Sequence, residues 1–130
     1  MREIKFRGKD MNGDWVYGLL TKKKIRNNGK ISWAIATGNC SLAETVPVVE
    51  ETIGEFTGCK DINGVEIYDG DILKDNDGHT CPLIRADGGW RMDYQELHDS
   101  VPFVFAYPFI QMWGLEVVGN IFEDKYNADD

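Results

Sequence analysis

The sequence has few cysteines, no long apolar run and fewer basic than acidic residues. Its three cysteines, Cys40, Cys59 and Cys81, are an odd count and lack the pattern of a secreted disulfide framework. The N-terminus, "MREIKFRGKD", contains no apolar stretch of signal-peptide length. The most apolar run, "VPFVFAYPFI" at 101–110, is too short to span a bilayer and includes two prolines. We therefore expect a protein of a reducing cytoplasm, without membrane partners.

The charge balance limits the classes of partner. The 130 residues include 14 Lys and Arg against 22 Asp and Glu, for a formal net charge of −8. Because affinity for a phosphate backbone comes from basic side chains, such a chain needs a local basic patch to bind nucleic acid. The length allows one domain or two very small ones, and the 42% apolar content is that of a globular protein.

Short segments in which apolar and polar residues alternate predict β-hairpins in the first third of the chain. "REIKFRGK" and "DWVYGLL" flank "DMNG", and "TKKKIR" and "KISWAIA" flank Asn27-Asn28-Gly29. Asn and Asp beside Gly provide the turn, since glycine tolerates a positive φ. Ser41 and Glu44 have capping-box spacing, which allows a short helical turn that Pro47 limits.

A repeat explains the densest cluster of carboxylates and glycines. "KDMNGDWVY" at 9–17 and "KDINGVEIY" at 60–68 have the same pattern 51 residues apart. Two hairpins with the same turn account for this repeat without a ligand. A calcium loop of the EF-hand type requires an acid five positions before its glycine and Glu six positions after it, and Gly13, Gly64 and Gly78 all fail this test.

Four carboxylates in the second copy are the candidates for catalysis or metal binding: Asp61, Glu66, Asp69 and Asp71. We interpret them as turn and strand residues, because aspartate is common in turns for its own hydrogen bonds. A metal-dependent enzyme that uses the Asp61–Asp71 acids stays as a third hypothesis.

A zinc site is the other metal hypothesis. Cys40, Cys59, His79 and Cys81 have suitable side chains, but they lack the paired spacing of a zinc knuckle. No nucleophile–base pair or phosphate-binding glycine loop is present in the sequence. We therefore predict neither a cofactor nor a metal and no enzymatic activity.

One basic patch is a candidate site for an anionic partner. Lys22, Lys24 and Arg26 share one side of a predicted strand, and Lys30 lies across the turn. No aromatic stacking platform is evident beside them, so we favour a solvated hairpin whose lysines discourage pairing between sheet edges.

The apolar segment at 101–110 is predicted to be a strand with two apolar faces. Four aromatics, Phe103, Phe105, Tyr107 and Phe109, share one of them. A chain this short has difficulty covering both faces, so we predict that these four residues mediate self-association. The alternative is that a loop around Trp33 or Trp90 covers them.

Three blocks of the sequence stand out together: "MREIKFRGKDMNGDWVYG", "ETIGEFTGCKDINGVEIYDGDIL" and "EVVGNIFED". In this order they resemble the YopX-like family of phage and prophage proteins. The central Thr-Gly-x-x-Asp-x-Asn-Gly-x-x-Ile-Tyr-x-Gly-Asp-Ile pattern is the most specific part. The linking regions 20–48 and 76–111 match little, and Phe122 and Asp124 stand where the family more often has Tyr and Asn.

The resemblance implies an all-β, mainly antiparallel fold with little helix and a C-terminal part like a small SH3-type barrel. We accordingly expect a β-hairpin region at 1–48 and an SH3-like β-barrel region at 49–130, unless both form one intertwined domain. The resemblance also implies a phage or prophage origin, in a bacterial host, and self-association. It implies no reaction and no site residues.

The sequence therefore leaves three functions open. The first is an accessory protein without enzymatic activity that binds itself or a host or phage protein. The second is a nucleic-acid-binding β-barrel that uses the Lys22–Lys30 patch, and the third is the metal-dependent enzyme. A basic, aromatic-lined groove would favour the second, and convergence of Glu66, Asp69 and Asp71 would favour the third.

Overall fold

A computed structural model of the chain describes residues 4–24, 29–37, 45–86, 89–94, 99–102 and 107–123. The chain divides into two compact units, Met1–Phe56 and Thr57–Asp130. This division lies later in the chain than the expected boundary between residues 48 and 49. Each unit is described separately below.

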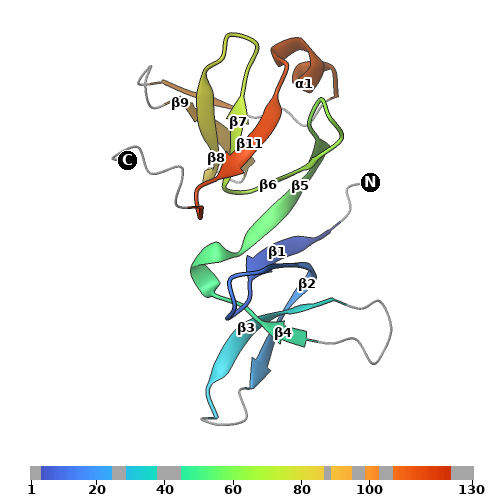
Figure 1. Cartoon of the computed structure of the whole chain (residues 1–130), viewed down its shortest axis with the longest axis vertical. Coiled ribbons are helices and arrows are strands. Elements are labelled where there is room, and N and C mark those ends of the chain that lie inside the picture. The colour runs from blue at the N-terminus through green and yellow to red at the C-terminus, as the bar shows by residue number, and fades with distance from the viewer. Residues whose placement is uncertain are drawn as a thin grey trace. The chain divides into compact units, whose positions relative to one another are not determined.

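The first unit is an antiparallel sheet with the strand order β4-β3-β2-β1-β5 (Figure 1). Its elements are β1 (Phe6–Lys9), β2 (Trp15–Lys24), β3 (Ile31–Ala36), β4 (Thr45–Pro47), the 3-10 helix η1 (Glu50–Thr52) and the start of β5 (Gly54–Lys60). Both predicted hairpins form, with Lys9 opposite Trp15 and Lys24 opposite Ile31. The possible helical turn at 41–44 lies outside the described residues, and Pro47 ends a strand.

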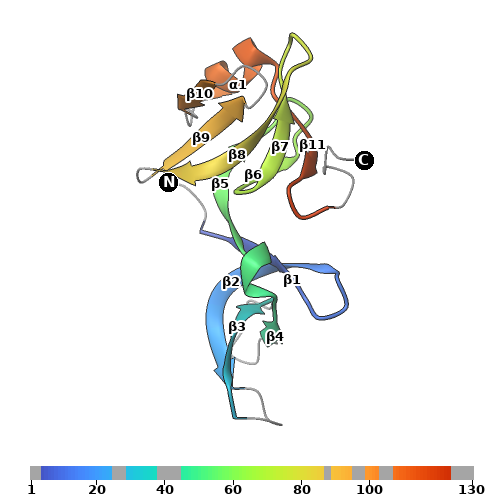
Figure 2. The same cartoon turned by 90° about the vertical axis from the view of Figure 1, so that its left-hand side faces the viewer.

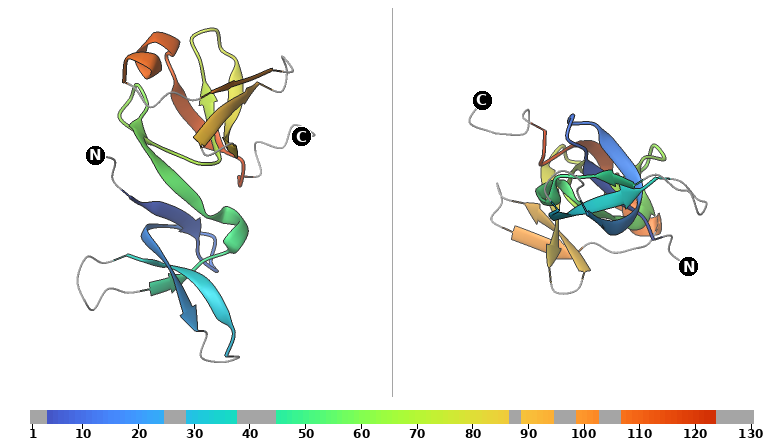
Figure 3. Two further views of the ribbon diagram at one scale, coloured as in Figure 1. Left: turned by 180° about the vertical axis from the view of Figure 1, so that it is seen from behind. Right: turned by 90° about the horizontal axis from the view of Figure 1, so that it is seen from below.

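The core of the first unit lies where the chain crosses the sheet after β4. Val48 donates its N–H to the carbonyl of Trp33, and Val49 donates to the carbonyl of Lys9. This segment therefore runs from β3 toward β1. Val48 is 2% exposed and packs on Gly8, where a Cβ would come within 3.1 Å of the Val48 Cβ. Figure 3 shows β2 and β3 as a long twisted hairpin in this unit.

The second unit contains the rest of β5, paired with β6 (Glu66–Tyr68), and a five-stranded antiparallel sheet. The sheet strands are β7 (Asp71–Lys74), β8 (Thr80–Ala86), β9 (Gly89–Tyr94), β10 (Asp99–Pro102) and β11 (Glu116–Asn120). Their order is β10-β9-β8-β7-β11, so the last strand lies beside β7 (Figure 2). The all-β prediction is confirmed. In the part of the chain that the structure describes, β10 and β11 are the edges of an open sheet, not of a closed barrel.

A short helix, α1 (Tyr107–Trp113), closes one side of this unit's core. Ile110 is buried with Leu73, Leu83 and Met92, and Phe109 and Trp113 pack against the same cluster. The prediction of a strand through residue 110 is therefore wrong from Tyr107 onward. Pro108 is tolerated because the first turn of a helix has no intrahelical partner for its N–H groups. Among the described residues, no helix has the length and apolar character needed to cross a membrane.

Candidate functional site

One turn occurs three times among the residues that the structure describes, with the same bonds each time. Its first residue is Asp10, Asp61 or Asp75, and its fourth is a glycine with φ of 85°, 83° or 84°. In each copy the aspartate Oδ1 accepts the backbone N–H groups two and four residues later, at 2.8–3.0 Å. This is a three-residue hairpin turn that needs glycine at its left-handed position. The turns predicted at Asp10–Gly13 and Asp61–Gly64 are confirmed.

Asp61 makes a further bond that joins distant parts of the second unit. Its Oδ2 accepts the backbone N–H of Val117 in β11 at 2.8 Å, and the residue is only 2% exposed. Both carboxylate oxygens of Asp61 therefore accept backbone N–H groups. Because such charge-assisted bonds are strong when buried, this aspartate stabilises the fold.

The other predicted acids are also engaged within the second unit. Asp71, 1% exposed, accepts the backbone N–H of Tyr68 at 2.7 Å, and Glu66 accepts the Tyr68 hydroxyl at 2.9 Å. In the described part of the chain, Asp61, Glu66, Asp69 and Asp71 do not form a group whose oxygen atoms could hold one ion. The convergence that would favour the third hypothesis is therefore not found there.

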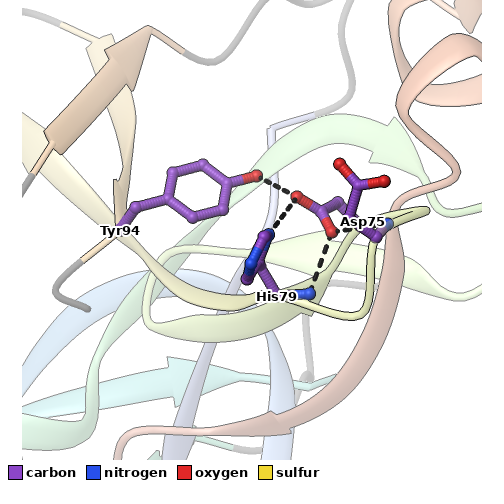
Figure 4. A network of polar contacts seen from close by, with 4 residues as sticks. Asp75, His79 and Tyr94 are labelled. Carbon is purple, nitrogen blue, oxygen red and sulfur yellow. Dashed lines mark hydrogen bonds and ion pairs between the residues drawn. The ribbon is translucent and has the colours of Figure 1, made fainter. Parts of the chain in front are cut away.

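The polar network of the second unit centres on Asp75 (Figure 4). Its Oδ2 accepts the hydroxyl of Tyr94 from β9 at 2.9 Å, and the same oxygen lies 4.0 Å from Nδ1 of His79. Together with Asp77, Asp75 and His79 offer ligand atoms within 4.8 Å of one another. This group was not predicted from the sequence, where the candidate ligands considered beside His79 were the cysteines.

Hydrogen bonds already occupy Asp75 as part of the hairpin. Oδ1 accepts the N–H groups of Asp77 and His79, while Oδ2 accepts from Tyr94. The next residue, Asn76, donates through Nδ2 to the carbonyl of Met112 and through its backbone N–H to that of Trp113. Since the last carbonyls of a helix lack intrahelical partners, this turn caps the end of α1. The hydrogen bonds of Asp75 and Asn76 thus have a structural role.

Burial changes the acidity of two groups beside Asp75. Cys81 is fully buried, and this burial raises the pKa of its thiol to about 11, helped by the negative charges of Asp75 and Asp93 and opposed by a hydrogen bond with Tyr94. Burial likewise raises the pKa of the Tyr94 hydroxyl, with the neighbouring Cys81 and Asp75 adding to the effect. Both groups are therefore protonated at neutral pH, and Cys81 has little thiolate to act as a nucleophile or metal ligand.

In the described part of the chain, Cys59, His79 and Cys81 do not form a group whose ligand atoms could hold one ion. Cys40 lies outside the described residues. Cys81 belongs to the core cluster, Cys59 packs against that cluster, and His79 is directed toward Asp75.

The basic patch lies on the hairpin of the first unit. Lys22 belongs to β2, Lys24 and Lys30 are exposed, and Arg26 lies outside the described residues. Lys22 is paired across the strands with Trp33, and its Nζ lies 4.7 Å from the centre of the Trp33 ring. A tryptophan therefore accompanies the lysines, although no aromatic stacking platform was evident from the sequence. Such a contact is a cation–π interaction, which adjacent strands bring about and sequence spacing does not reveal.

A hollow of about 540 Å³ lies beside this cation–π pair. Its apolar lining includes Met11, Ile31, Trp33 and Val49, and its charged lining is Lys22, Lys30, Glu50 and Glu51. The lysines come from the β2–β3 hairpin and its turn, whereas the glutamates belong to η1. The positive and the negative side chains that line the hollow thus come from different elements.

The two units differ in charge. Residues 1–56 contain nine basic and seven acidic residues, a formal charge of +2, whereas residues 57–130 contain five basic and fifteen acidic residues, a formal charge of −10. The net charge of −8 therefore comes from the second unit, and the first unit is weakly basic.

The predicted aromatic self-association surface is only partly described. Phe103 and Phe105 lie outside the described residues, and Tyr107 is the first residue of α1. Phe109 stacks on Trp113 with ring centres 5.3 Å apart and packs against the core. Tyr107 and Phe109 therefore do not belong to one strand face, while a role of the segment in self-association stays a prediction.

These features define a small, two-unit antiparallel β protein whose most distinctive carboxylates hold turns and strands in place. A model of the YopX protein family matches residues 5–125, and the chain belongs to that family. A solved structure, protein EF1440 from Enterococcus faecalis, is similar with a TM-score of 0.58 and 24% sequence identity, covering 96% of this chain and 97% of that one. At this identity the likeness concerns the fold alone. Curated proteins provided no significant match.

Proposed function

We propose that this chain is an accessory protein of a phage or prophage and works in the cytoplasm of the bacterial host. It acts by binding protein, first a second copy of itself, and it catalyses no reaction. One observation supports this most: Asp61, Asp71 and Asp75, central to the acidic segments, accept hydrogen bonds from the chain's own backbone. An acid or base in catalysis needs an oxygen directed at a substrate.

The exposed apolar side chains of the first unit support association. Met11 and Ile31 are each more than half exposed, and both line the hollow beside Trp33. Apolar side chains gathered at one exposed place are typical of interaction surfaces, whereas single scattered ones are common on any protein.

Nucleic-acid binding is the second candidate, and the Lys22–Trp33 pair favours it. A lysine beside an aromatic ring on a weakly basic unit has the chemistry of single-strand recognition. Against it, Glu50 and Glu51 line the same hollow and would repel a phosphate backbone.

Affinity purification distinguishes the two candidates. A tagged copy is produced together with an untagged copy in phage-infected or lysogenic cells, and the lysate is treated with nuclease before capture. The proposal predicts that the untagged copy, or a reproducible protein partner, is retained after nuclease treatment. Capture that nuclease abolishes would support the nucleic-acid candidate and contradict protein association.

A further inference from the structure

The hollow of the first unit brings together exposed apolar side chains. Met11 is 64% exposed, Ile31 70% and Val49 36%, and all three line it together with the half-buried Trp33. They come from the β1–β2 turn, from β3 and from the segment before η1. Three separate parts of the chain thus direct apolar side chains to one concave place, which is the form of an interaction surface.

The charges around this apolar centre are balanced and separated. Lys22 and Lys30 stand on the hairpin, and Glu50 and Glu51 stand on η1. A nucleic acid would meet the two glutamates, and a uniformly acidic or basic protein would meet like charges at one of the two elements. Like charges brought together at an interface oppose binding.

A surface with cations on one element and anions on another is complementary to itself. In a two-fold dimer the same patch faces its own copy. When the two-fold axis runs between the hairpin and η1, the hairpin lysines of one subunit lie opposite the η1 glutamates of its partner, twice. We propose that this hollow is the contact surface of a two-fold dimer of the chain, with Met11, Ile31, Trp33 and Val49 at its centre and the lysine and glutamate pairs around it. This rests on the proposed function, since it assigns the self-association to a particular surface.

Paired charge reversals test the arrangement. One variant carries Lys22→Glu and Lys30→Glu, and the other carries Glu50→Lys and Glu51→Lys. Each should self-associate at least about tenfold more weakly than the wild type, because every reversal occurs twice in a symmetric contact. An equimolar mixture should form a heterodimer tighter than either variant's own dimer, since one variant presents four negative and the other four positive side chains. Sedimentation equilibrium measures all of these, and circular dichroism checks that each variant is folded.

Leu19→Glu is the matched control. Leu19 is an apolar residue of β2, 58% exposed, that does not line the hollow, and this variant should associate like the wild type. If the wild type self-associates while the two charge-reversed variants behave like it, the inference is wrong and the proposed function stands. If the wild type stays monomeric at about 100 µM, both self-association and this contact surface are rejected.

Discussion

Asp61 and Val117 are 56 positions apart in the sequence, yet Oδ2 of Asp61 accepts the backbone N–H of Val117 at 2.8 Å. The other oxygen of the same carboxylate accepts the N–H groups of Asn63 and Val65. One side chain therefore fixes a hairpin turn and attaches β11 to it. These three backbone donors explain why an acidic residue is buried at this place.

Asp61→Ala should lower the free energy of unfolding by about 3 kcal/mol, because three backbone N–H groups lose a charged acceptor in a buried place. Asp10 forms the same turn on the surface, so Asp10→Ala should lower it by only about 1 kcal/mol. Urea denaturation followed by circular dichroism measures both. Equal losses for the two variants would mean that the Val117 bond adds nothing.

Asn76 and Gly114 form a second coupled pair, at the end of α1. Gly114 has φ of +62°, and the amide of Asn76 occupies the space that a Cβ at position 114 would need. Gly114→Ala should therefore lower the free energy of unfolding by about 2–3 kcal/mol, from the left-handed backbone and the steric conflict together.

The steric part can be isolated with a double-mutant cycle. In an Asn76→Ala background, Gly114→Ala should lower the stability by only about 1 kcal/mol, which is the backbone part alone. Gly13→Ala is the control, because Gly13 has φ of +85° and a Cβ added there would meet nothing within 4 Å. Additive losses from Asn76→Ala and Gly114→Ala would contradict the contact.

Stability should decrease in alkaline solution. In the folded chain the pKa of Cys81 is about 11, compared with an ordinary value of 9.0. Between these two pH values the unfolded chain loses the thiol proton while the folded chain keeps it. Protons are then bound preferentially by the folded state, so the free energy of unfolding falls as the pH rises, by no more than about 1.4 kcal/mol per pH unit from this group.

Denaturation at about pH 8.5 to 10.5 measures this slope, because the range spans the ordinary thiol pKa. Cys81→Ala should reduce it, and Cys59→Ala, which removes a half-buried thiol beside the same core, serves as the control. The raised pKa of Tyr94 acts in the same direction, so some slope should remain in Cys81→Ala. An unchanged slope in Cys81→Ala would show that the buried thiol does not titrate as described.

Purified protein should contain much less than one calcium or zinc ion per chain. Asp75 is the acid best placed to bind a cation, but its oxygens already accept hydrogen bonds from Asp77, His79 and Tyr94. Elemental analysis provides the measurement. A near-stoichiometric metal that disappears with Asp75→Asn, Asp71→Asn or Cys81→Ser would overturn the structural interpretation of these residues.

Local turn chemistry made the hairpins predictable. Asp and Asn before Gly identified the turns at 10–13 and 61–64, because the carboxylate bonds and the positive φ depend only on neighbouring residues. The same turn at Asp75–Gly78 was not predicted, because Asp77 replaces the asparagine of the repeat. The residues on either side of this turn also differ from those of the repeat.

Features that depend on pairing between distant segments were not predictable. Lys22 meets Trp33 only through the register of β2 and β3, and Asp61 meets Val117 only because β11 returns beside β7. The helix α1 was mistaken for strand because its alternating apolar residues fit a period of two. Burial of Ile110 and stacking of Phe109 on Trp113 select the helix instead.

The aromatic segment provides a separate test of self-association. If Phe105 contributes to a subunit contact, Phe105→Glu should weaken association by about tenfold or more while the β-sheet circular dichroism is retained. Phe109→Ala is expected to behave differently, because Phe109 packs against the core and its loss should lower stability by about 3 kcal/mol. If Phe105→Glu leaves association unchanged, the segment is not part of the contact.

Sedimentation equilibrium of the wild-type chain tests the central claim, that this YopX family member works by association, most directly. The monomer has a mass of 14.7 kDa. We predict a weight-average mass that rises with protein concentration toward twice this value, and a weaker association at high salt because charged pairs contribute. A single species of 14.7 kDa up to about 100 µM would contradict the account.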